Sequence, residues 1–186
     1  MNKQSKNICI HVCDDNPVAI EEAIKITKDL LNEEGLAAEI ITYKDGNQFT
    51  EGYKERKDEL IILDIEMPGK SGLDILKEFE THCKNNRVIL LTAYDNLALQ
   101  SLTYVEFQIV RKDLMEFDLE KAIRRFLRIR NEQNAQLEIK EDGMQRVVDI
   151  KDIFYIEKRR NYSYIYLKDR RCVKVRKNLR DYEFEL

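Results

Sequence analysis

Residues 60–64 of this chain, Leu-Ile-Ile-Leu-Asp, are a short apolar run that ends in a single carboxylate. Such a run is typical of a strand that is buried on both faces of a parallel sheet. Ligands of open α/β sheets bind at the carboxyl ends of the strands, so this strand delivers Asp64 to a place where chemistry is expected. The alternative is that Asp64 only caps a turn or the following helix, as Asp often does.

On both sides of residues 60–64, strand-like apolar runs alternate with segments of helical periodicity. We expect strands at 8–13, 38–43, 60–64, 87–92 and 107–112, and helices at 18–34, 47–56, 71–79, 95–102 and 117–134. Parallel neighbours need crossover connections, which are nearly always right-handed. The sequence therefore predicts an α/β fold: a five-stranded parallel doubly wound sheet, followed by a long helix, in a first domain over residues 1–130.

Polar residues stand at the ends of four of these strands: Asp14, Asp15, Asp64, Thr92 and Lys112. Crowded carboxylates either raise a pKa or bind a hard cation, and Mg²⁺ suits two carboxylates together with carbonyl and water oxygens. A lysine charge and a threonine hydroxyl can hold a phosphoryl group while a carboxylate attacks phosphorus. Each residue alone is a common capping, strand-end or surface residue, but their joint placement favours phosphoryl transfer.

The source of the phosphoryl group is expected to be another protein or a small phosphodonor. The sequence contains neither Gly-x-Gly-x-x-Gly nor a complete Walker-type motif, so no nucleotide loop is evident. A phosphatase of the haloacid-dehalogenase type, with Asp64 as nucleophile, is disfavoured. That chemistry requires a second Asp two residues on, where this chain has Glu66.

Residues 8 to about 130 resemble the receiver domain of two-component response regulators, which has a flavodoxin-like fold. The resemblance is carried by Cys-Asp-Asp-Asn-Pro at 13–17, Leu-Asp-Ile-Glu-Met-Pro-Gly-Lys-Ser-Gly at 63–72, Leu-Thr-Ala at 91–93, and Lys112. It implies that Asp64 accepts phosphate from a sensor histidine kinase, so that the chain is a phosphoacceptor and not an enzyme. It also implies the roles of the remaining site residues: Asp15, Asp64 and the backbone carbonyl of Glu66 as Mg²⁺ ligands, Asp14 acting on Mg²⁺ through water, and Thr92 and Lys112 on the phosphoryl group.

Two positions depart from the receiver pattern. The family usually follows its lysine with a proline in a cis peptide, whereas here Asp113 follows Lys112. A cis bond before a non-proline costs about 2.5–4 kcal/mol, so we expect a trans or strained loop. The family also often has Tyr or Phe three residues before the lysine as a switch. That position is Ile109 here, and Phe107 or Tyr104 would have to substitute for it.

Composition is that of a cytoplasmic globular protein with no membrane partner. The 186 residues carry a net charge of −3, with 43% hydrophobic and 36% charged residues. No apolar run reaches the roughly 18–20 residues of a membrane helix, and no signal peptide is evident. The four cysteines have no disulfide or zinc-ribbon spacing. Cys9, His11 and Cys13 offer a weak metal-site alternative to buried packing, and His82 is expected at the surface or at a helix end.

Beyond the long helix the pattern changes to short strands joined by polar turns, after a linker at 131–136. We expect these strands at 137–140, 145–150, 153–157, 162–168 and 172–177. Residues 158–180 hold ten Lys or Arg against one acid, Asp169, and three tyrosines are interleaved with them. A basic and aromatic stretch is typical of a nucleic-acid surface, although a solvated basic face is the alternative.

Residues 137–186 resemble the first part of the LytTR DNA-binding domain, notably in the stretches 148–157 and 177–183. In that family an all-β fold inserts loops into successive major grooves of double-stranded DNA. By position, the resemblance assigns DNA contacts to Arg159, Arg160, Asn161 and Tyr162. A full domain of that family is about twice as long, so the resemblance implies a partial all-β segment, which is truncated by nature, truncated by its preparation, or completed by exchange within a dimer.

Two functions from different classes follow. The first is a transcription regulator in which phosphorylation of Asp64 promotes formation of a homodimer that binds repeated half-sites on DNA. The second is a phosphorylation-dependent protein-interaction module that does not bind DNA because its DNA-binding domain is incomplete. Salt-dependent DNA binding by the 186-residue chain distinguishes them.

Overall fold

The computed structural model describes residues 8–56, 58–79, 87–93, 107–141 and 144–176. Four features of the sequence analysis lie outside the described residues: the helix at 95–102, His82, Tyr104 and the stretch 177–183. The chain divides into two compact units, residues 1–127 and residues 128–186.

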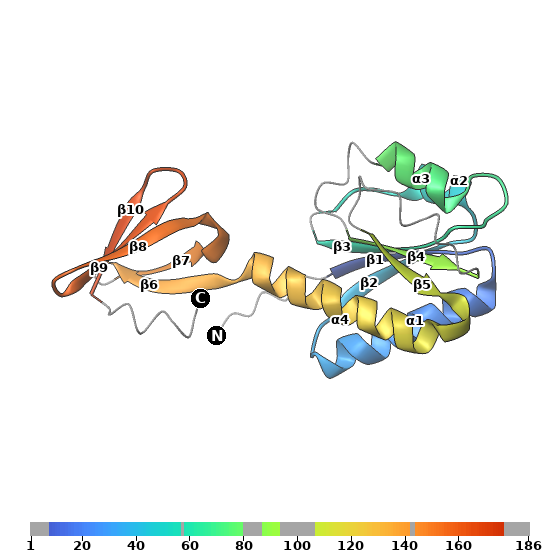
Figure 1. Ribbon diagram of the computed structural model, residues 1–186, viewed down its shortest axis with the longest axis horizontal. Coiled ribbons are helices and arrows are strands. Elements are labelled where there is room, and N and C mark those ends of the chain that lie inside the picture. Colours follow the sequence, from blue (N-terminus) through green and yellow to red (C-terminus); the bar gives the residue numbers. More distant parts are fainter. Residues whose placement is uncertain (1–7, 57, 80–86, 94–106, 142–143, 177–186) are drawn as a thin grey trace. The chain divides into compact units, whose positions relative to one another are not determined.

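The first unit is built on a sheet in which all strands pair in parallel. Its strands are β1 (Ile8–Cys13), β2 (Ala38–Tyr43), β3 (Glu59–Asp64), β4 (Arg87–Thr92) and β5 (Phe107–Arg111). The strand order is β2-β1-β3-β4-β5 (Figure 1). The runs richest in aliphatic residues lie inside the sheet and the mixed runs at its edges, because only inner strands are covered on every side.

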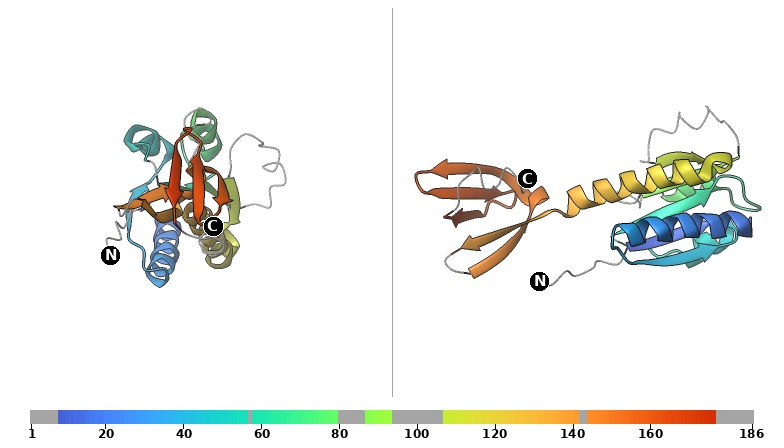
Figure 2. Two further views of the ribbon diagram at one scale, coloured as in Figure 1. Left: turned by 90° about the vertical axis from the view of Figure 1, so that its left-hand side faces the viewer. Right: turned by 90° about the horizontal axis from the view of Figure 1, so that it is seen from below.

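Helices cover both faces of this sheet: α1 (Pro17–Glu33), α2 (Gly46–Gly52), α3 (Gly72–Phe79) and α4 (Met115–Asn134). α1 and α4 lie side by side on one face, and α2 and α3 lie on the other (Figures 1 and 2). Because side chains alternate along a strand, β3 sends Leu60 and Ile62 into the first core and Ile61 and Leu63 into the second. The predicted doubly wound α/β fold is confirmed. Among the helices described, none has both the length and the apolar character needed to cross a membrane.

The loop after β1 is fixed by the start of α1. The Asn16 side chain accepts a hydrogen bond from the Val18 backbone N–H at 3.0 Å, and Pro17 occupies the first turn. The residue that follows the helix end, Gly35, has a positive φ of 63°, which glycine adopts without strain. The acidic pair at Asp14 and Asp15 is therefore held between a buried strand and a capped helix.

The second helix is shorter than predicted. We expected it at residues 47–56, but α2 ends at Gly52, and Tyr53 is extended, with φ −67° and ψ 134°. The Tyr53 ring stacks on Phe49 with centroids 5.1 Å apart, and its hydroxyl donates a hydrogen bond to Glu59. Leaving the helix at Tyr53 lets the ring and the hydroxyl reach buried partners, and this tertiary packing overrides the local helical pattern.

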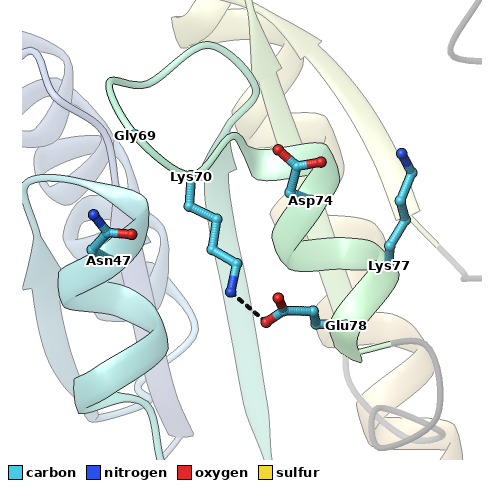
Figure 3. A pocket seen from close by; sticks show the side chains of 6 residues that line it. All are labelled: Asn47, Gly69, Lys70, Asp74, Lys77 and Glu78. Atoms are coloured by element: carbon cyan, nitrogen blue, oxygen red, sulfur yellow. Dashed lines mark hydrogen bonds and ion pairs between the residues drawn. The ribbon is translucent and has the colours of Figure 1, made fainter.

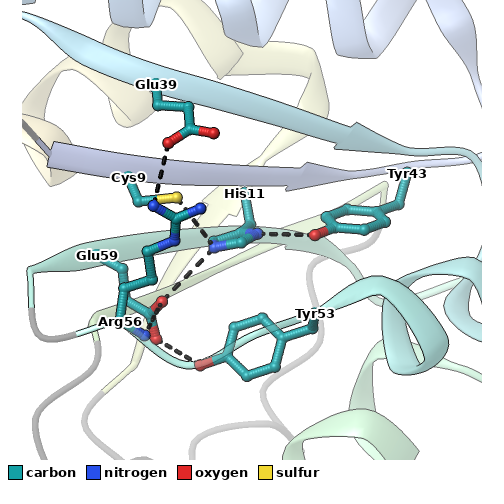
Figure 4. Close-up of polar contacts among 7 residues, drawn as sticks. All are labelled: Cys9, His11, Glu39, Tyr43, Tyr53, Arg56 and Glu59. Atoms are coloured by element: carbon teal, nitrogen blue, oxygen red, sulfur yellow. Dashed lines mark hydrogen bonds and ion pairs between the residues drawn. The ribbon is translucent and has the colours of Figure 1, made fainter.

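A polar cluster is buried under α2 (Figure 4). His11 is 1% exposed, and its Nδ1 lies 3.0 Å from the Tyr43 hydroxyl. Its Nε2 lies 3.5 Å from Glu59 Oε2 and 3.3 Å from Cys9 Sγ. Tyr53 reaches the same carboxylate. The cluster satisfies polar groups that would be costly to bury alone.

The metal alternative for Cys9, His11 and Cys13 finds no support in this geometry. Cys13 Sγ donates to the backbone oxygen of Asp45 and to Met67 Sδ, so it has different partners from Cys9. Burial, with smaller contributions from nearby carboxylates, raises the pKa of the Cys13 thiol to about 12, so the thiol stays protonated. The two thiols act as small buried groups, as the packing interpretation expected.

The second unit consists of antiparallel strands: β6 (Gln136–Glu141), β7 (Met144–Asp149), β8 (Ile153–Arg159), β9 (Tyr162–Leu167) and β10 (Cys172–Val175). β6 and β7 form a hairpin, and the other three form a sheet in the order β10-β9-β8. A core of buried aliphatic residues joins them: Leu137, Ile139, Ile165, Leu167, Val173 and Val175. The predicted all-β segment after the long helix is confirmed.

Candidate functional site

The ends of the parallel strands bring the predicted polar residues to one edge of the sheet. Asp14 follows β1, Asp64 ends β3, Thr92 ends β4 and Lys112 follows β5. Ligand atoms of Asp14, Asp15 and Asp64 lie within 4.8 Å of one another, the only such cluster of His, Cys, Asp or Glu among the described residues. Asp14, Asp64 and Thr92 are buried, whereas Asp15 is exposed. The cluster is therefore open to solvent on the Asp15 side.

Lys112 joins two of these carboxylates. Its Nζ lies 2.8 Å from Asp14 Oδ2 and 3.0 Å from Asp64 Oδ2. Asp14 Oδ1 accepts a hydrogen bond from the Asn16 backbone N–H at 2.9 Å. Asp14 Oδ2 is fully buried and accepts no hydrogen bond of good angular geometry, so its contact with Lys112 is an ion pair. A buried carboxylate oxygen thus remains directed into the site.

Opposing effects shift the pKa values of Asp64 and Lys112. Burial raises the pKa of Asp64 above its ordinary value, and the Asp14 carboxylate adds to this. Lys112 and the backbone N–H of Glu66 oppose the rise because they hydrogen-bond the charged form. Burial disfavours the charge of Lys112, but its two carboxylate partners outweigh burial and raise the pKa of Lys112.

The donor set fits a hard divalent cation. Asp14 and Asp64 pair with the Lys112 ammonium and the Asp15 carboxylate lies beside them, so negative charge is in excess at the site. Oxygen ligands, one of them a buried oxygen without an aligned donor, are what Mg²⁺ prefers. Glu66 stands two residues beyond Asp64 and is exposed, in the loop that leads to α3. These residues fit the Mg²⁺ ion that the sequence analysis assigned to them.

Glycines hold this loop against the strand end. A Cβ atom on Gly72 would lie 2.2 Å from the backbone oxygen of Asp64, and a Cβ atom on Gly46 would lie 2.1 Å from that of Lys70. The Gly72 N–H donates to the Ile65 oxygen at 3.1 Å. The sequence analysis assigned no role to these glycines. The glycines near Asp64 in the sequence were the available indication. The close approach of each glycine to a backbone oxygen is seen only in the folded chain.

The chain after β5 differs from the expected strand 107–112. β5 ends at Arg111, and Lys112 opens a one-turn 3-10 helix, Lys112–Leu114, that leads into α4. The Lys112–Asp113 peptide is trans. This early turn directs the Lys112 amine back toward Asp14 and Asp64. Ile109 and Phe107 both pack, partly buried, against the α2/α3 core.

A separate hollow of about 630 Å³ lies between α2 and α3 (Figure 3). It is lined by Asn47, Gly69, Lys70, Asp74, Lys77 and Glu78. Lys70 pairs with Glu78, and Asp74 accepts a hydrogen bond from Ser71 Oγ. Because two of its lining carboxylates already have partners and none of the acidic cluster lines it, the hollow is not the reactive site.

A family model described as the response regulator receiver domain matches residues 10–124 and so includes the whole acidic cluster, Thr92 and Lys112. The chain belongs to the response regulator receiver domain family. A solved receiver domain from Clostridium thermocellum is 28% identical, with a TM-score of 0.50, and the match covers 67% of this chain and 97% of that one. The polar residues gathered at the sheet edge therefore belong to the receiver domain of the chain.

Two further relatives match the chain over very different lengths. The sensory transduction protein LytT of Oceanobacillus iheyensis is 22% identical over 187 residues, which cover 96% of this chain and 74% of LytT. The sporulation initiation phosphotransferase F of Bacillus subtilis is 48% identical over 44 residues, which cover 24% of this chain and 35% of that protein. The similarity to LytT runs through both units of the chain.

The residues that the sequence analysis assigned to DNA lie together at one turn of the second unit. Arg159 ends β8 and pairs with Tyr162, the first residue of β9, so that Arg160 and Asn161 form a two-residue hairpin turn. All four side chains are exposed. Arg160 has a positive φ of 55°, a backbone conformation that favours glycine. The tip of the turn therefore presents the Arg160 guanidinium and the Asn161 amide, whereas Arg159 in β8 pairs with Glu157.

Proposed function

We propose that this receiver domain accepts a phosphoryl group on Asp64 from a sensor histidine kinase and that phosphorylation controls DNA binding by the second unit. The observation that carries the proposal is the Lys112 amine between Asp14 and Asp64, at 2.8 and 3.0 Å. An ammonium group in this position stabilises the negative charge of a phosphoryl group that is added to Asp64. The chain is then a phosphoacceptor and acts on no separate substrate.

In the proposed transfer, a carboxylate oxygen of Asp64 attacks phosphorus and the bond between phosphorus and the donor atom breaks. Lys112 moves its hydrogen bond from Asp64 to an oxygen of the transferred group, and the Thr92 hydroxyl donates to another. Asp15, Asp64 and the carbonyl of Glu66 would hold Mg²⁺, with Asp14 acting through water. When bound, that cation supplies charge neutralisation on the phosphoryl oxygens.

The proposed kinase contact lies at the same edge of the sheet. Val18 in the first turn of α1 is 68% exposed, Phe117 in the first turn of α4 is 70% exposed, and Leu114 just before α4 is 42% exposed. Both helices cover the same sheet face and begin near the strand ends that carry the acidic cluster. Exposed apolar side chains beside a reactive carboxylate suit a protein that must deliver a phosphoryl group there.

The proposed DNA contact rests on the second unit. Residues 128–186 contain fifteen Lys or Arg and eleven Asp or Glu, whereas residues 1–127 contain seventeen and twenty-four. Positive charge attracts the phosphate backbone, and Arg159, Arg160, Asn161 and Tyr162 would make the contacts at the turn. We also propose a homodimer on phosphorylation, because two linked turns bind repeated half-sites far better than one.

The phosphoacceptor is tested by incubating the purified chain with acetyl phosphate and Mg²⁺ and locating the phosphoryl group by mass spectrometry. The wild type and Asp29→Asn, a change on the exposed side of α1, should be phosphorylated. Asp64→Asn should not be phosphorylated while keeping its circular dichroism spectrum. Phosphorylation of Asp64→Asn to the wild-type level would refute the assignment.

DNA binding is tested by fluorescence anisotropy with a labelled mixed-sequence duplex at two salt concentrations, before and after phosphorylation. We expect binding that weakens steeply with salt and tightens on phosphorylation. Efficient phosphorylation without DNA binding would contradict the second half of the proposal and favour a module that acts through protein partners.

A further inference from the structure

One face of the β10-β9-β8 sheet is the core of the second unit, and the other face carries a column of tyrosines. The strand registers place these residues on that outer face: Tyr155, Glu157 and Arg159 of β8, Tyr162, Tyr164 and Tyr166 of β9, and Cys172 and Lys174 of β10. We call this set the tyrosine face. The intervening residues of β9 and β10, Ser163, Ile165, Leu167, Val173 and Val175, are buried.

The aromatic rings of the tyrosine face already have partners on their flat sides. Lys174 Nζ lies 4.1 Å from the ring centroid of Tyr162 and 6.0 Å from that of Tyr164. The guanidinium of Arg159 lies 5.4 Å from the centroid of Tyr164. Tyr155 and Tyr166 stack on each other at 4.4 Å. A nucleotide base could stack on the same side of one of these rings only by displacing the partner already there.

The groups that the tyrosine face can offer to a partner are therefore phenol hydroxyls and the Lys174 ammonium, because the Arg159 guanidinium is held by Glu157. Its one carboxylate, Glu157, is paired with Arg159 at 2.9 Å. The neighbouring Lys158 and Arg160 add positive charge at the turn. Hydroxyl and cationic N–H donors are complementary to phosphate oxygens, not to base faces.

This chemistry distinguishes between two forms of nucleic acid. A single strand is held mainly by stacking of its bases on aromatic rings, which the occupied rings disfavour here. A duplex keeps its bases stacked inside and presents a dense row of phosphates, about one charge per 1.7 Å of axis. From Tyr162 to Tyr166 the column is about 13 Å long, so it can face several phosphates.

We propose that the tyrosine face binds the phosphodiester backbone of double-stranded DNA, next to the contacts at the Arg160–Asn161 turn. The inference rests on the proposed function and adds a second surface to it, with Lys174 and the hydroxyl of Tyr164 as phosphate donors. Lys174 lies on β10, outside the two turn residues Arg160 and Asn161, and its amine contacts the ring of Tyr162 at the start of β9. Its loss therefore tests the tyrosine face with both turn residues in place.

The test compares DNA affinities over a range of salt concentrations, on one mixed-sequence duplex. Each lost phosphate contact lowers the salt slope by about 0.9, so between about 50 and 200 mM salt the rise in Kd becomes about 3.5-fold smaller. We expect this loss for Lys174→Gln and near wild-type values for Lys174→Arg. The control, Lys140→Gln, removes the same charge from an exposed position on β6, in the other sheet.

The outcomes separate this inference from the function on which it rests. Absence of DNA binding by the wild type would overturn both. If the wild type binds DNA and the salt slope of Lys174→Gln is unchanged, the tyrosine face alone is overturned. An equal loss of salt slope in Lys140→Gln would also overturn it, because the loss would then depend on net charge. A weaker affinity of Tyr164→Phe, with an unchanged melting temperature, supports the hydroxyl as a second donor. Wild-type affinity of Tyr164→Phe would remove that hydroxyl from the face.

Discussion

A Cβ atom placed on Gly72 would lie 2.2 Å from the backbone oxygen of Asp64, closer than non-bonded atoms approach. The loop that follows the candidate phosphoacceptor is thus packed against the phosphoacceptor's own backbone. Ile65 extends this attachment, because its N–H donates to the Leu91 oxygen at 3.0 Å on the neighbouring strand. The position of the Asp64 carboxylate depends on a contact that only glycine permits.

Gly72→Ala should therefore displace Asp64 and slow its phosphorylation by acetyl phosphate. Overpacking of this kind typically costs about 1–3 kcal/mol of unfolding free energy. Gly35→Ala is the matched control, because Gly35 has a positive φ of 63° but nothing within 4 Å of an added Cβ. The control should lose stability and keep the phosphorylation rate. Equal rates in the two variants, measured where both are folded, would contradict the role of the close contact.

The strand ends were predictable from the sequence because they depend on local patterns. Apolar runs that stop at Asp14, Asp64, Thr92 and Lys112 already mark one edge of a parallel sheet, and the structure brings these residues to that edge. The end of α2 was not predictable in this way. Tyr53 leaves the helix to reach Glu59, which stands in the next strand, and no local periodicity records that partner.

Contacts that depend on the strand register could not be predicted from the sequence either. The pairing of Cys9 with Glu59 in neighbouring strands brings His11 and Glu59 together, and it replaces the weak metal alternative with a hydrogen-bonded cluster. Alternation along β9 places its tyrosines on one face, but the partner of each ring, a cation or another tyrosine, is fixed by the register with β8 and β10. Such partners follow from the fold as a whole.

The raised pKa of Asp64 predicts a pH-dependent cost of folding in the absence of metal. The folded state holds the Asp64 proton more tightly than the unfolded state, so the carboxyl destabilises the fold increasingly as pH rises above its ordinary pKa of 3.8. The cost becomes constant above the folded pKa. Asp64→Asn removes the titrating group and should be more stable than the wild type at neutral pH.

The measurement is urea denaturation in EDTA at pH values from about 3.5 to 7. The stability difference between Asp64→Asn and the wild type should grow with pH and then level off, whereas Asp29→Asn should show no such growth. A difference that shrinks as pH rises would show that Lys112 over-compensates burial and would contradict the predicted sign.

Mg²⁺ should stabilise the wild type through the acidic cluster. A ligand at one hundred times its Kd adds about 2.7 kcal/mol to the free energy of unfolding, so the melting temperature should rise by several degrees. Asp15→Asn should lose most of this rise because it removes the most exposed carboxylate of the cluster. Asp113→Asn, an exposed carboxylate next to Lys112, is the control and should respond like the wild type. A full response in Asp15→Asn would remove that residue from the ligand set.

Arg160→Gly should separate DNA binding from stability. Arg160 has a φ of 55°, where a side chain costs about 1–2 kcal/mol and glycine costs little, so the variant should be at least as stable as the wild type. Its DNA affinity should fall severalfold, because the tip of the turn loses its arginine. Arg170→Gly provides a matched control, since Arg170 has a φ of 70° in the turn between β9 and β10 and loses the same charge. We expect both variants to keep or raise the melting temperature and only Arg160→Gly to lose affinity. An equal loss in Arg170→Gly would mean that total charge, and not the Arg160–Asn161 turn, determines binding.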